Sequence, residues 1–240
     1  MEIMNTRLPQ SQLRPLAPAA ALFGCILAFA VSSASASVVW DLNPNHQNGA
    51  VGSSSLTLTS QGYQITARGY DNVSGPDTSH ELYFKQAGPV GGASESGLGL
   101  VGTIDNELQV TNGTPDNYIQ LDLRQILSQG FTNGAISVGS VQQGEQFSIY
   151  GSASQGQLGT LLGTYGSTFD NQFVNITNFG QYAYISVGAA NDDVLPVAFR
   201  ADITPVPEMN SLFPIVGLAT AIGTTHMLRR RQLRKRNVAG

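Results

Sequence analysis

Three short acidic runs in this chain carry the residue types that bind a hard metal ion. Loop carboxylates and amides suit Ca²⁺, which takes about six to eight oxygen ligands. Asp and Asn are also frequent in turns for a structural reason, because their side chains bond their own backbone. Bound calcium is therefore one hypothesis beside a plain turn role, and no other cofactor is expected. The runs are Asp105, Asn106 and Glu107, then Asp116 and Asn117, and finally Asn191, Asp192 and Asp193.

Two tyrosines offer a second kind of chemistry. Tyr182 and Tyr184 alternate with Ala183 and Ile185, so an extended strand would place both rings on one face. A pair of exposed flat rings with polar edges is a stacking surface for a sugar. The pattern therefore predicts a sugar platform, or else aromatic residues that stabilise the strand from its solvent side.

Catalysis has little support in the residue types. Within 37–205 the only histidines are His46 and His80, so a serine–histidine–acid triad has few members to draw on. Paired carboxylates serve glycosidases, and Glu95 with Glu107 is the first pair to consider. We predict that the chain is not an enzyme, with a small polysaccharide hydrolase as the third hypothesis.

The glycines of GLGLVG (97–102) match a dinucleotide-binding fingerprint in spacing only. That fingerprint needs a helix after the glycines, whose amides hold a pyrophosphate. Gly113 and Pro115 follow soon after and exclude a crossover helix. Nucleotide binding is therefore not predicted.

The elements that must position these residues are short apolar or alternating runs, separated by Gly, Asn, Ser and Asp. In YIQLDL (118–123) the aliphatic residues fall on one face and the polar ones on the other, which is the period of a half-buried antiparallel strand. Runs spaced by roughly 10–20 residues predict an all-β fold, an antiparallel two-sheet β-sandwich. A jelly roll is the preferred form and a Greek-key sandwich the alternative. The runs begin at Val38, Ser55, Tyr63, Glu81, Tyr118, Ala135, Gln146, Thr160, Gln172, Tyr182 and Val194.

Three further residues refine this prediction. DLRQILSQG (122–130) is the one stretch that favours a helix, with Asp122 to cap it and Gly130 to end it. Pro196 lies inside the last run, which therefore belongs at a sheet edge or carries a bulge. Trp40, the only tryptophan in the chain, is expected in the core.

Charge is unevenly distributed along the chain. Within 37–205 there are 14 acidic and 4 basic side chains, a net charge of −10, whereas the whole chain has a net charge of −4. An acidic domain repels phosphate backbones. A nucleic-acid partner is therefore not expected.

The N-terminal segment reads as a signal peptide over 1–36. The apolar run Leu16–Val31 follows a positively charged start, and Ala34-Ser35-Ala36 is the small-x-small pattern at which signal peptidase cuts, here after Ala36. Cys25, the only cysteine, would leave with this segment. The exported domain (37–205) must then be stable without a disulfide.

A second apolar run lies at 211–228, near the minimum length for a membrane-spanning helix. A basic cluster follows it, which is typical of a cytoplasmic end. The tail is thus either a permanent anchor or a signal that is recognised and removed. The cluster consists of Arg229, Arg230, Arg231, Arg234, Lys235 and Arg236.

The residues before this run favour the second possibility. Val206, Pro207 and Glu208, followed by the apolar run and the terminal arginines, resemble the PEP-CTERM sorting signal of Gram-negative bacteria. The resemblance covers about 206–240 and implies that an exosortase recognises the tail and that the protein reaches the cell surface or extracellular matrix. Met209 stands where the family usually has a second proline, so a permanently anchored form stays open.

The middle of the chain loosely resembles the β-sandwich ectodomains found in proteins with such tails. The resemblance implies no catalytic activity. We therefore expect an exported surface or matrix protein with a structural or adhesive role, and a carbohydrate-binding module for exopolysaccharide as the alternative. The segments that carry the resemblance are ESGLGL (95–100), DNEL (105–108), YIQLDL (118–123) and FSIYGS (147–152).

Overall fold

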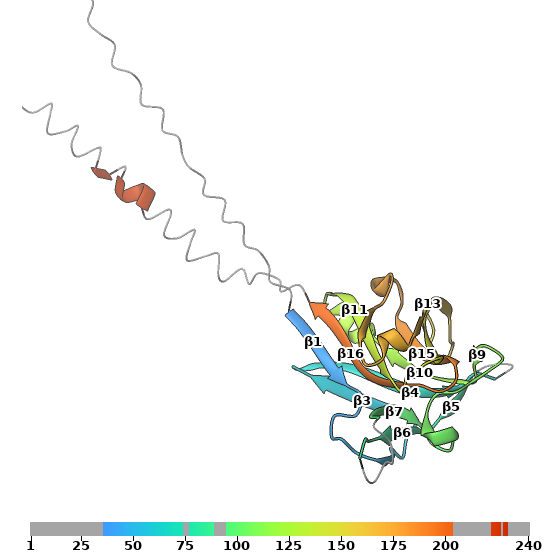
Figure 1. The fold of residues 1–240 in the computed structure, drawn as a ribbon. Helices are drawn as coiled ribbons and strands as arrows, with labels where there is room; N and C mark the ends of the chain where they lie inside the picture. Colours follow the sequence, from blue (N-terminus) through green and yellow to red (C-terminus); the bar gives the residue numbers. More distant parts are fainter. Residues whose placement is uncertain (1–35, 74–76, 89–94, 204–221, 227, 230–240) are drawn as a thin grey trace, which may run out of the picture. The chain divides into compact units, whose positions relative to one another are not determined.

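The computed structural model describes residues 36–73, 77–88, 95–203, 222–226 and 228–229 (Figure 1). The part from 36 to 203 consists mainly of strands, and all the strand pairs named below are antiparallel. The all-β prediction is therefore confirmed. The choice between a jelly roll and a Greek key stays a prediction.

Two large sheets and two small ones make up the described domain. The first large sheet has the order β1-β16-β11-β14, and the second has the order β13-β12-β15-β10-β4-β3, with β5 paired to β4. The strands of the first are β1 (Ala36–Asp41), β16 (Leu195–Ile203), β11 (Phe131–Gly139) and β14 (Phe173–Asn175). Those of the second are β13 (Thr160–Gly166), β12 (Gln146–Ser152), β15 (Tyr184–Asn191), β10 (Asn117–Asp122), β4 (Tyr63–Asp71), β3 (Ser55–Ser60) and β5 (Thr78–His80).

Shorter elements close the ends of the large sheets. The small sheets have the orders β2-β6-β7 and β8-β9. Their strands are β2 (Gly49–Ala50), β6 (Leu82–Lys85), β7 (Gly97–Leu100), β8 (Val110–Thr111) and β9 (Thr114–Pro115). The helical turns are α1 (Arg124–Ser128), η1 (Ile104–Asn106), η2 (Ser167–Phe169) and η3 (Phe179–Gln181).

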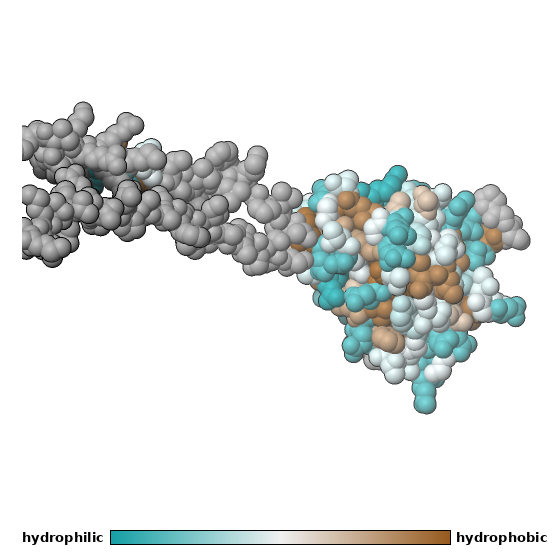
Figure 2. Space-filling model, turned by 90° about the horizontal axis from the view of Figure 1, so that it is seen from above, coloured by the Kyte–Doolittle hydropathy of each residue, from teal (hydrophilic) through white to brown (hydrophobic). Residues whose placement is uncertain are grey.

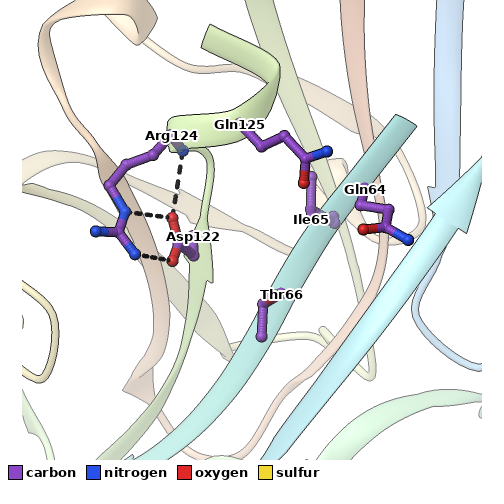
Figure 3. Close-up of a pocket in the computed structure, with 6 residues that line it drawn as sticks. All are labelled: Gln64, Ile65, Thr66, Asp122, Arg124 and Gln125. Atoms are coloured by element: carbon purple, nitrogen blue, oxygen red, sulfur yellow. Dashed lines mark hydrogen bonds and ion pairs between the residues drawn. The ribbon is translucent and has the colours of Figure 1, made fainter. Parts of the chain in front are cut away.

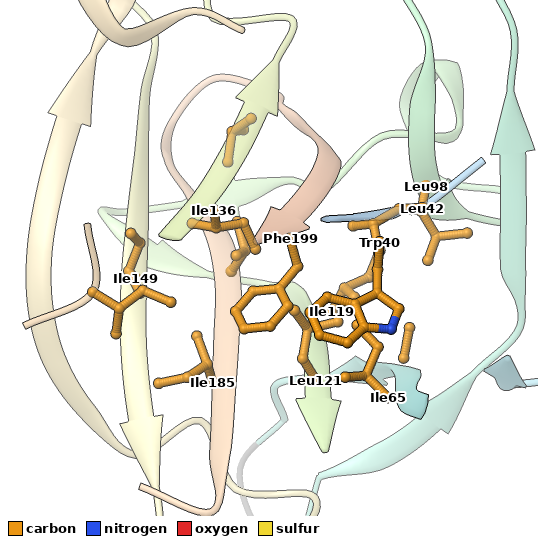
Figure 4. Packing of buried hydrophobic residues seen from close by; sticks show 14 of the residues in the cluster. Trp40, Leu42, Ile65, Leu98, Ile119, Leu121, Ile136, Ile149, Ile185 and Phe199 are labelled. Carbon is orange, nitrogen blue, oxygen red and sulfur yellow. The ribbon is translucent and has the colours of Figure 1, made fainter. Parts of the chain in front are cut away.

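Apolar side chains from both large sheets fill the space between them (Figure 4). Trp40 on β1 packs against Phe199 on β16, with ring centroids 5.5 Å apart. Ile65 on β4 and Leu121 on β10 come from the other sheet, and all four residues are fully buried. Burial of each such side chain contributes about 1.5–3 kcal/mol. A chain with a single cysteine forms no internal disulfide, so this burial is what stabilises the fold. The prediction for Trp40 is confirmed.

The alternating pattern of β10 places the aliphatic residues on the core side, as predicted, but its other face is not exposed. Tyr118 and Gln120 are both 0% exposed. The loop after β12 covers Gln120, whose amide donates to the Gln157 carbonyl at 3.0 Å and accepts from the Gly156 N–H at 2.9 Å, and Tyr118 stacks on Tyr70. The prediction of a half-buried strand is therefore wrong for β10.

Most local predictions agree with the structure. Helix α1 lies where a helix was predicted, but its N-cap residue is Leu123 rather than the predicted Asp122, whose carboxylate accepts from the Arg124 N–H at 3.3 Å. β16 lies between β1 and β11, so it is not an edge strand, but its pairing with β11 shifts register at Pro196. The shift supplies the bulge that the proline needs.

The domain begins and ends at the same place. Ala36, the first residue of β1, is directly opposite Ile203, the last residue of β16. A cut after Ala36 would shorten β1 by one residue.

Several predicted features lie outside the described residues. These are Ala34, the sorting motif Val206, Pro207 and Glu208, most of the apolar run at 211–228, and the basic cluster apart from Arg229. Residues 222–226 and 228–229 are helical. Within the parts of the chain that the structure describes, no helix has the length and apolar character needed to cross a membrane.

Candidate functional site

A buried lysine gathers three carboxylates at the end of the domain away from Ala36. Lys85, the last residue of β6, has a side chain that is only 3% exposed. Its ammonium group donates to Asp105 at 2.6 Å and to Glu107, and lies 3.6 Å from Glu95. The strand pair β6–β7 and the turn η1 hold these groups together, since the acids are distant from Lys85 in sequence.

Glu107 is the most perturbed acid of this cluster. Its side chain is 1% exposed, and its Oε2 has no hydrogen bond of normal geometry, although Ser140 lies near. Burial raises the pKa of Glu107 to about 7, against the opposing effect of the Lys85 ammonium group. The ion pair therefore compensates a charge that burial alone would neutralise.

The residues predicted to bind calcium fall into separate places. Asp105 and Glu107 contact Lys85, whereas Asp116 accepts from the Thr111 hydroxyl at 2.6 Å and Asn117 accepts from the Gln109 N–H at 3.0 Å. The first pair already has a cation, and the second has the local bonds that turn residues make. Asn106 has a left-handed backbone, and its side chain accepts from the Gly102 N–H at 3.0 Å.

A second acidic group lies next to the Lys85 cluster. Carboxylate oxygens of Glu145, Asp192 and Asp193 lie within 4.8 Å of one another. Burial, followed by repulsion from Asp192, raises the pKa of Asp193. Calcium binding stays a prediction for Asp192 and Asp193 and for the other two acidic runs, and the Lys85 contacts count against it for Asp105 and Glu107.

The carboxylate pair considered for glycoside hydrolysis is close in space but shielded. Oxygens of Glu95 and Glu107 lie within 4.8 Å of each other, a separation of the order that a retaining mechanism uses. Lys85 lies between the two acids, and Glu107 is 1% exposed. A sugar ring has no access to the Glu107 carboxylate in this arrangement.

The sugar platform expected from Tyr182 and Tyr184 is not formed. Tyr184 is 4% exposed, and the Arg124 guanidinium lies over its ring, 5.2 Å from the centroid. Tyr182 precedes β15 and packs closely over Gly151. Tyr184 is buried on β15, whereas Tyr182 lies outside that strand and is partly buried against the core, so the two rings share no exposed face and that prediction is wrong.

His80 contacts a carboxylate, as a catalytic histidine often does, but its other ring nitrogen faces a backbone carbonyl rather than a nucleophile. Its Nδ1 lies 2.6 Å from the Asp71 carboxylate, and its Nε2 lies 2.7 Å from the Val101 carbonyl oxygen. Because both ring nitrogens face acceptors, only the doubly protonated ring donates to both. Burial lowers the pKa of His80, but the bonds to Asp71 and Val101 outweigh burial and raise it above 6.5.

This geometry predicts a pH-dependent contribution to stability. A raised pKa in the folded state means that the contribution is complete below 6.5 and is lost as the pH rises through the folded value. Against His80→Gln, wild type is expected to lose about 1 kcal/mol of unfolding free energy between about pH 6 and pH 9. Urea titrations at both pH values measure this loss, and an equal change in both proteins would contradict it.

Among the described residues, two of the open hollows lie on the second large sheet. One has a volume of about 300 Å³ and is lined by Gln64, Thr66, Asp122 and Arg124 (Figure 3). Its two charged groups are committed to each other, because Arg124 bonds Asp122 through two nitrogens at 2.9 and 2.7 Å. The other hollow has a volume of about 640 Å³ and lies between the 155–158 loop and the end of β4.

Among the residues that the structure describes, exposed large apolar side chains do not gather at either hollow. The face shown in Figure 2 mixes hydrophobic and hydrophilic residues. Leu161 on β13 is 53% exposed and Ile104 in η1 is 75% exposed, but they belong to distant parts of the fold. Phe173 on β14 is partly covered by the Arg200 guanidinium at 4.6 Å.

Sequence reasoning found the acids but missed the groups that organise them. Lys85 is one of only two lysines in the chain and ends an apolar run. Its position in that run was the one feature of the sequence that could have indicated a buried lysine paired with acids. Asn72 and Asp77, which line the larger hollow, gave no such signal. Protein-family models, curated proteins and solved structures yielded no match to this chain.

Proposed function

We propose that this chain is an exported protein of the cell surface or extracellular matrix, with a structural or adhesive role. In this proposal 1–36 is a signal peptide, and 206–240 is a sorting tail recognised by an exosortase-type enzyme, with a membrane-spanning helix at about 211–228. The tail holds the protein in the membrane before processing, or permanently if Met209 prevents cleavage. The partner on the outer side is exopolysaccharide.

The pairing of Ala36 with Ile203 carries the proposal. A domain whose two ends meet at one place is held at that place by its tail and presents the opposite end outward. β16 spans nine residues from Leu195 to Ile203, or roughly 30 Å at 3.3 Å per residue. The Lys85 cluster lies near the Leu195 end, because Leu108 bridges Val194 there.

The proposed cleavage of the signal peptide and the tail can be tested on the processed protein. We expect the surface fraction of a Gram-negative host that makes an exosortase to contain a chain that begins at Ser37 and lacks the basic residues 229–236. Mass spectrometry of tryptic and non-tryptic peptides from that fraction measures both ends. The double variant Pro207→Ala, Glu208→Ala is the control and should keep the basic residues.

Each part of the proposal has its own contradicting result. Wild-type protein that carries residues 229–236 in the surface fraction would contradict removal of the tail and leave the permanently anchored form. A chain that stays in the cytoplasm with residues 1–36 attached would contradict export itself.

A further inference from the structure

The larger hollow has the hydrogen-bonding character of a sugar site. Tyr70, Asn72, Asp77, Ser79 and Gln155 line its wall. Its volume of about 640 Å³ is within the range of about 300–1,000 Å³ usual for small-ligand sites. The polar wall suits a polyol better than an apolar ligand, since each buried hydroxyl needs a partner.

The wall of this hollow is held in place from behind. Tyr118 is fully buried, stacks on Tyr70 with ring centroids 5.4 Å apart, and donates its hydroxyl to Asp77 at 2.6 Å. Asn72 donates its amide to the Pro115 carbonyl at 2.7 Å. These bonds fix the side chains before any ligand arrives, which lowers the entropy cost of binding.

The loop on the other side is fixed in the same way. The buried Gln120 bonds both Gly156 and Gln157, as described above. Gly156 has φ +67, and a Cβ there would lie 3.2 Å from the Tyr70 ring. The loop therefore approaches the ring more closely than a residue with a side chain would allow.

Several groups in the wall keep unused bonding capacity. Within the described residues, the side chains of Ser79 and Gln155 make no hydrogen bond. Asn72 is bonded through its amide nitrogen and Asp77 through one oxygen, so each keeps an acceptor oxygen. Amide, hydroxyl and carboxylate groups together match the paired donors and acceptors of neighbouring sugar hydroxyls.

Charge selects among sugars. The described residues that line the hollow include one acid, Asp77, and no Lys, Arg or His. A uronate, sulfate or phosphate group would meet a like charge without a compensating cation. The hollow therefore favours an uncharged ring.

We propose that this hollow binds a neutral sugar residue of a polysaccharide. The inference rests on the proposed matrix role and names the class of ligand for it. The hollow takes the place of the sugar platform that was predicted at Tyr182 and Tyr184. The hollow lies at the Tyr70 end of β4, whereas the Tyr63 end packs on Phe131, the neighbour of Ile203. Tyr70 is thus roughly 23 Å along the strand from the end at which the tail leaves, and β5 lies on that far side (Figure 1).

Saturation-transfer NMR tests the inference on the full chain, held in a detergent without a sugar head group. The probes are neutral oligosaccharides cut from dextran, mannan, galactan and xylan, with oligogalacturonate as the acidic probe. We expect transfer to at least one neutral probe and weaker or no transfer to the acidic one. Asn72→Ala and Gln155→Ala should each weaken binding about three- to ten-fold.

The matched control is Gln125→Ala, in the smaller hollow of Figure 3, which should leave affinity unchanged. Fluorescence of Trp40 during thermal unfolding checks that each variant is folded. No transfer to any neutral probe, stronger transfer to oligogalacturonate, or binding indifferent to both hollow variants would each overturn the inference. None of these results bears on processing of the tail, which mass spectrometry tests separately.

Discussion

Replacing Lys85 with methionine is expected to lower the free energy of unfolding by about 3–5 kcal/mol. The side chains of Lys85 and Glu107 are 3% and 1% exposed and contact each other directly. Removing the ammonium group leaves the Glu107 carboxylate buried without a counter-charge, and the desolvation of that charge is then uncompensated. Urea denaturation followed by the fluorescence of Trp40 measures the loss.

A double variant separates this cause from a packing defect. Adding Glu107→Gln to Lys85→Met removes the uncompensated charge, so at least half of the lost stability should return. The exposed pair Arg124–Asp122 supplies the control, since the Arg124 side chain is 61% exposed and Arg124→Met should leave the free energy of unfolding nearly unchanged. A double variant no more stable than Lys85→Met would rule out the electrostatic explanation.

The loss should also depend on pH. The raised pKa of Glu107, about 7 against 4.5 for an unperturbed glutamate, means that the folded state holds the proton more tightly than the unfolded chain. The stabilising contribution of that proton is complete below pH 4.5 and is lost as the pH rises through about 7. Lys85→Met should therefore be less destabilising at about pH 5 than at about pH 8, where Glu107 must carry its charge.

Truncating Trp40 to alanine is expected to cost about 3–5 kcal/mol. The residue is 1% exposed, packs on Phe131 and Phe199, and donates its Nε1 hydrogen to the Tyr63 carbonyl at 3.0 Å. Its loss leaves a cavity between the sheets and removes the hydrogen bond to the Tyr63 carbonyl. Circular dichroism during urea denaturation measures the effect, because the variant has no tryptophan.

The neighbouring residue provides the control for this prediction. Val39 is on the same strand but is 43% exposed, so Val39→Ala should change stability by less than about 0.5 kcal/mol. Similar losses in both variants would mean that β1 depends on strand pairing rather than on the tryptophan side chain.

The strands were predictable because their signal is local. Alternation in YIQLDL placed Ile119 and Leu121 on the core side, and both are buried. β7 (Gly97–Leu100) was not predicted as a strand, since glycine has a low strand propensity. A Cβ at Gly99 would collide with the backbone oxygen of Asn106, so this strand needs the glycine for close packing against η1.

The candidate sites were less predictable, because each depends on contacts between distant segments. The acidic runs were visible in the sequence, but Lys85 meets Asp105 and Glu107 only through the pairing of β6 with β7 and the turn that follows. Burial of Gln120 depends on the loop that contains Gln157. The hydrophobic pattern of a strand does not indicate what will cover its polar face. Tyr118 and Gln120 were therefore predicted to face solvent.

The pairing of the terminal strands determines how the domain carries tension. β16 lies between β1 and β11 and ends at Ile203, three residues before the proposed tail at 206–240. A pull on the tail against a ligand held at the far end acts along β16. The hydrogen-bond ladders that join β16 to β1 and to β11 are then sheared, and their bonds share the force. A pull between the two chain ends would instead peel β1 away from β16 one bond at a time. A domain held only by its tail, with its amino end free, is loaded in its stronger direction.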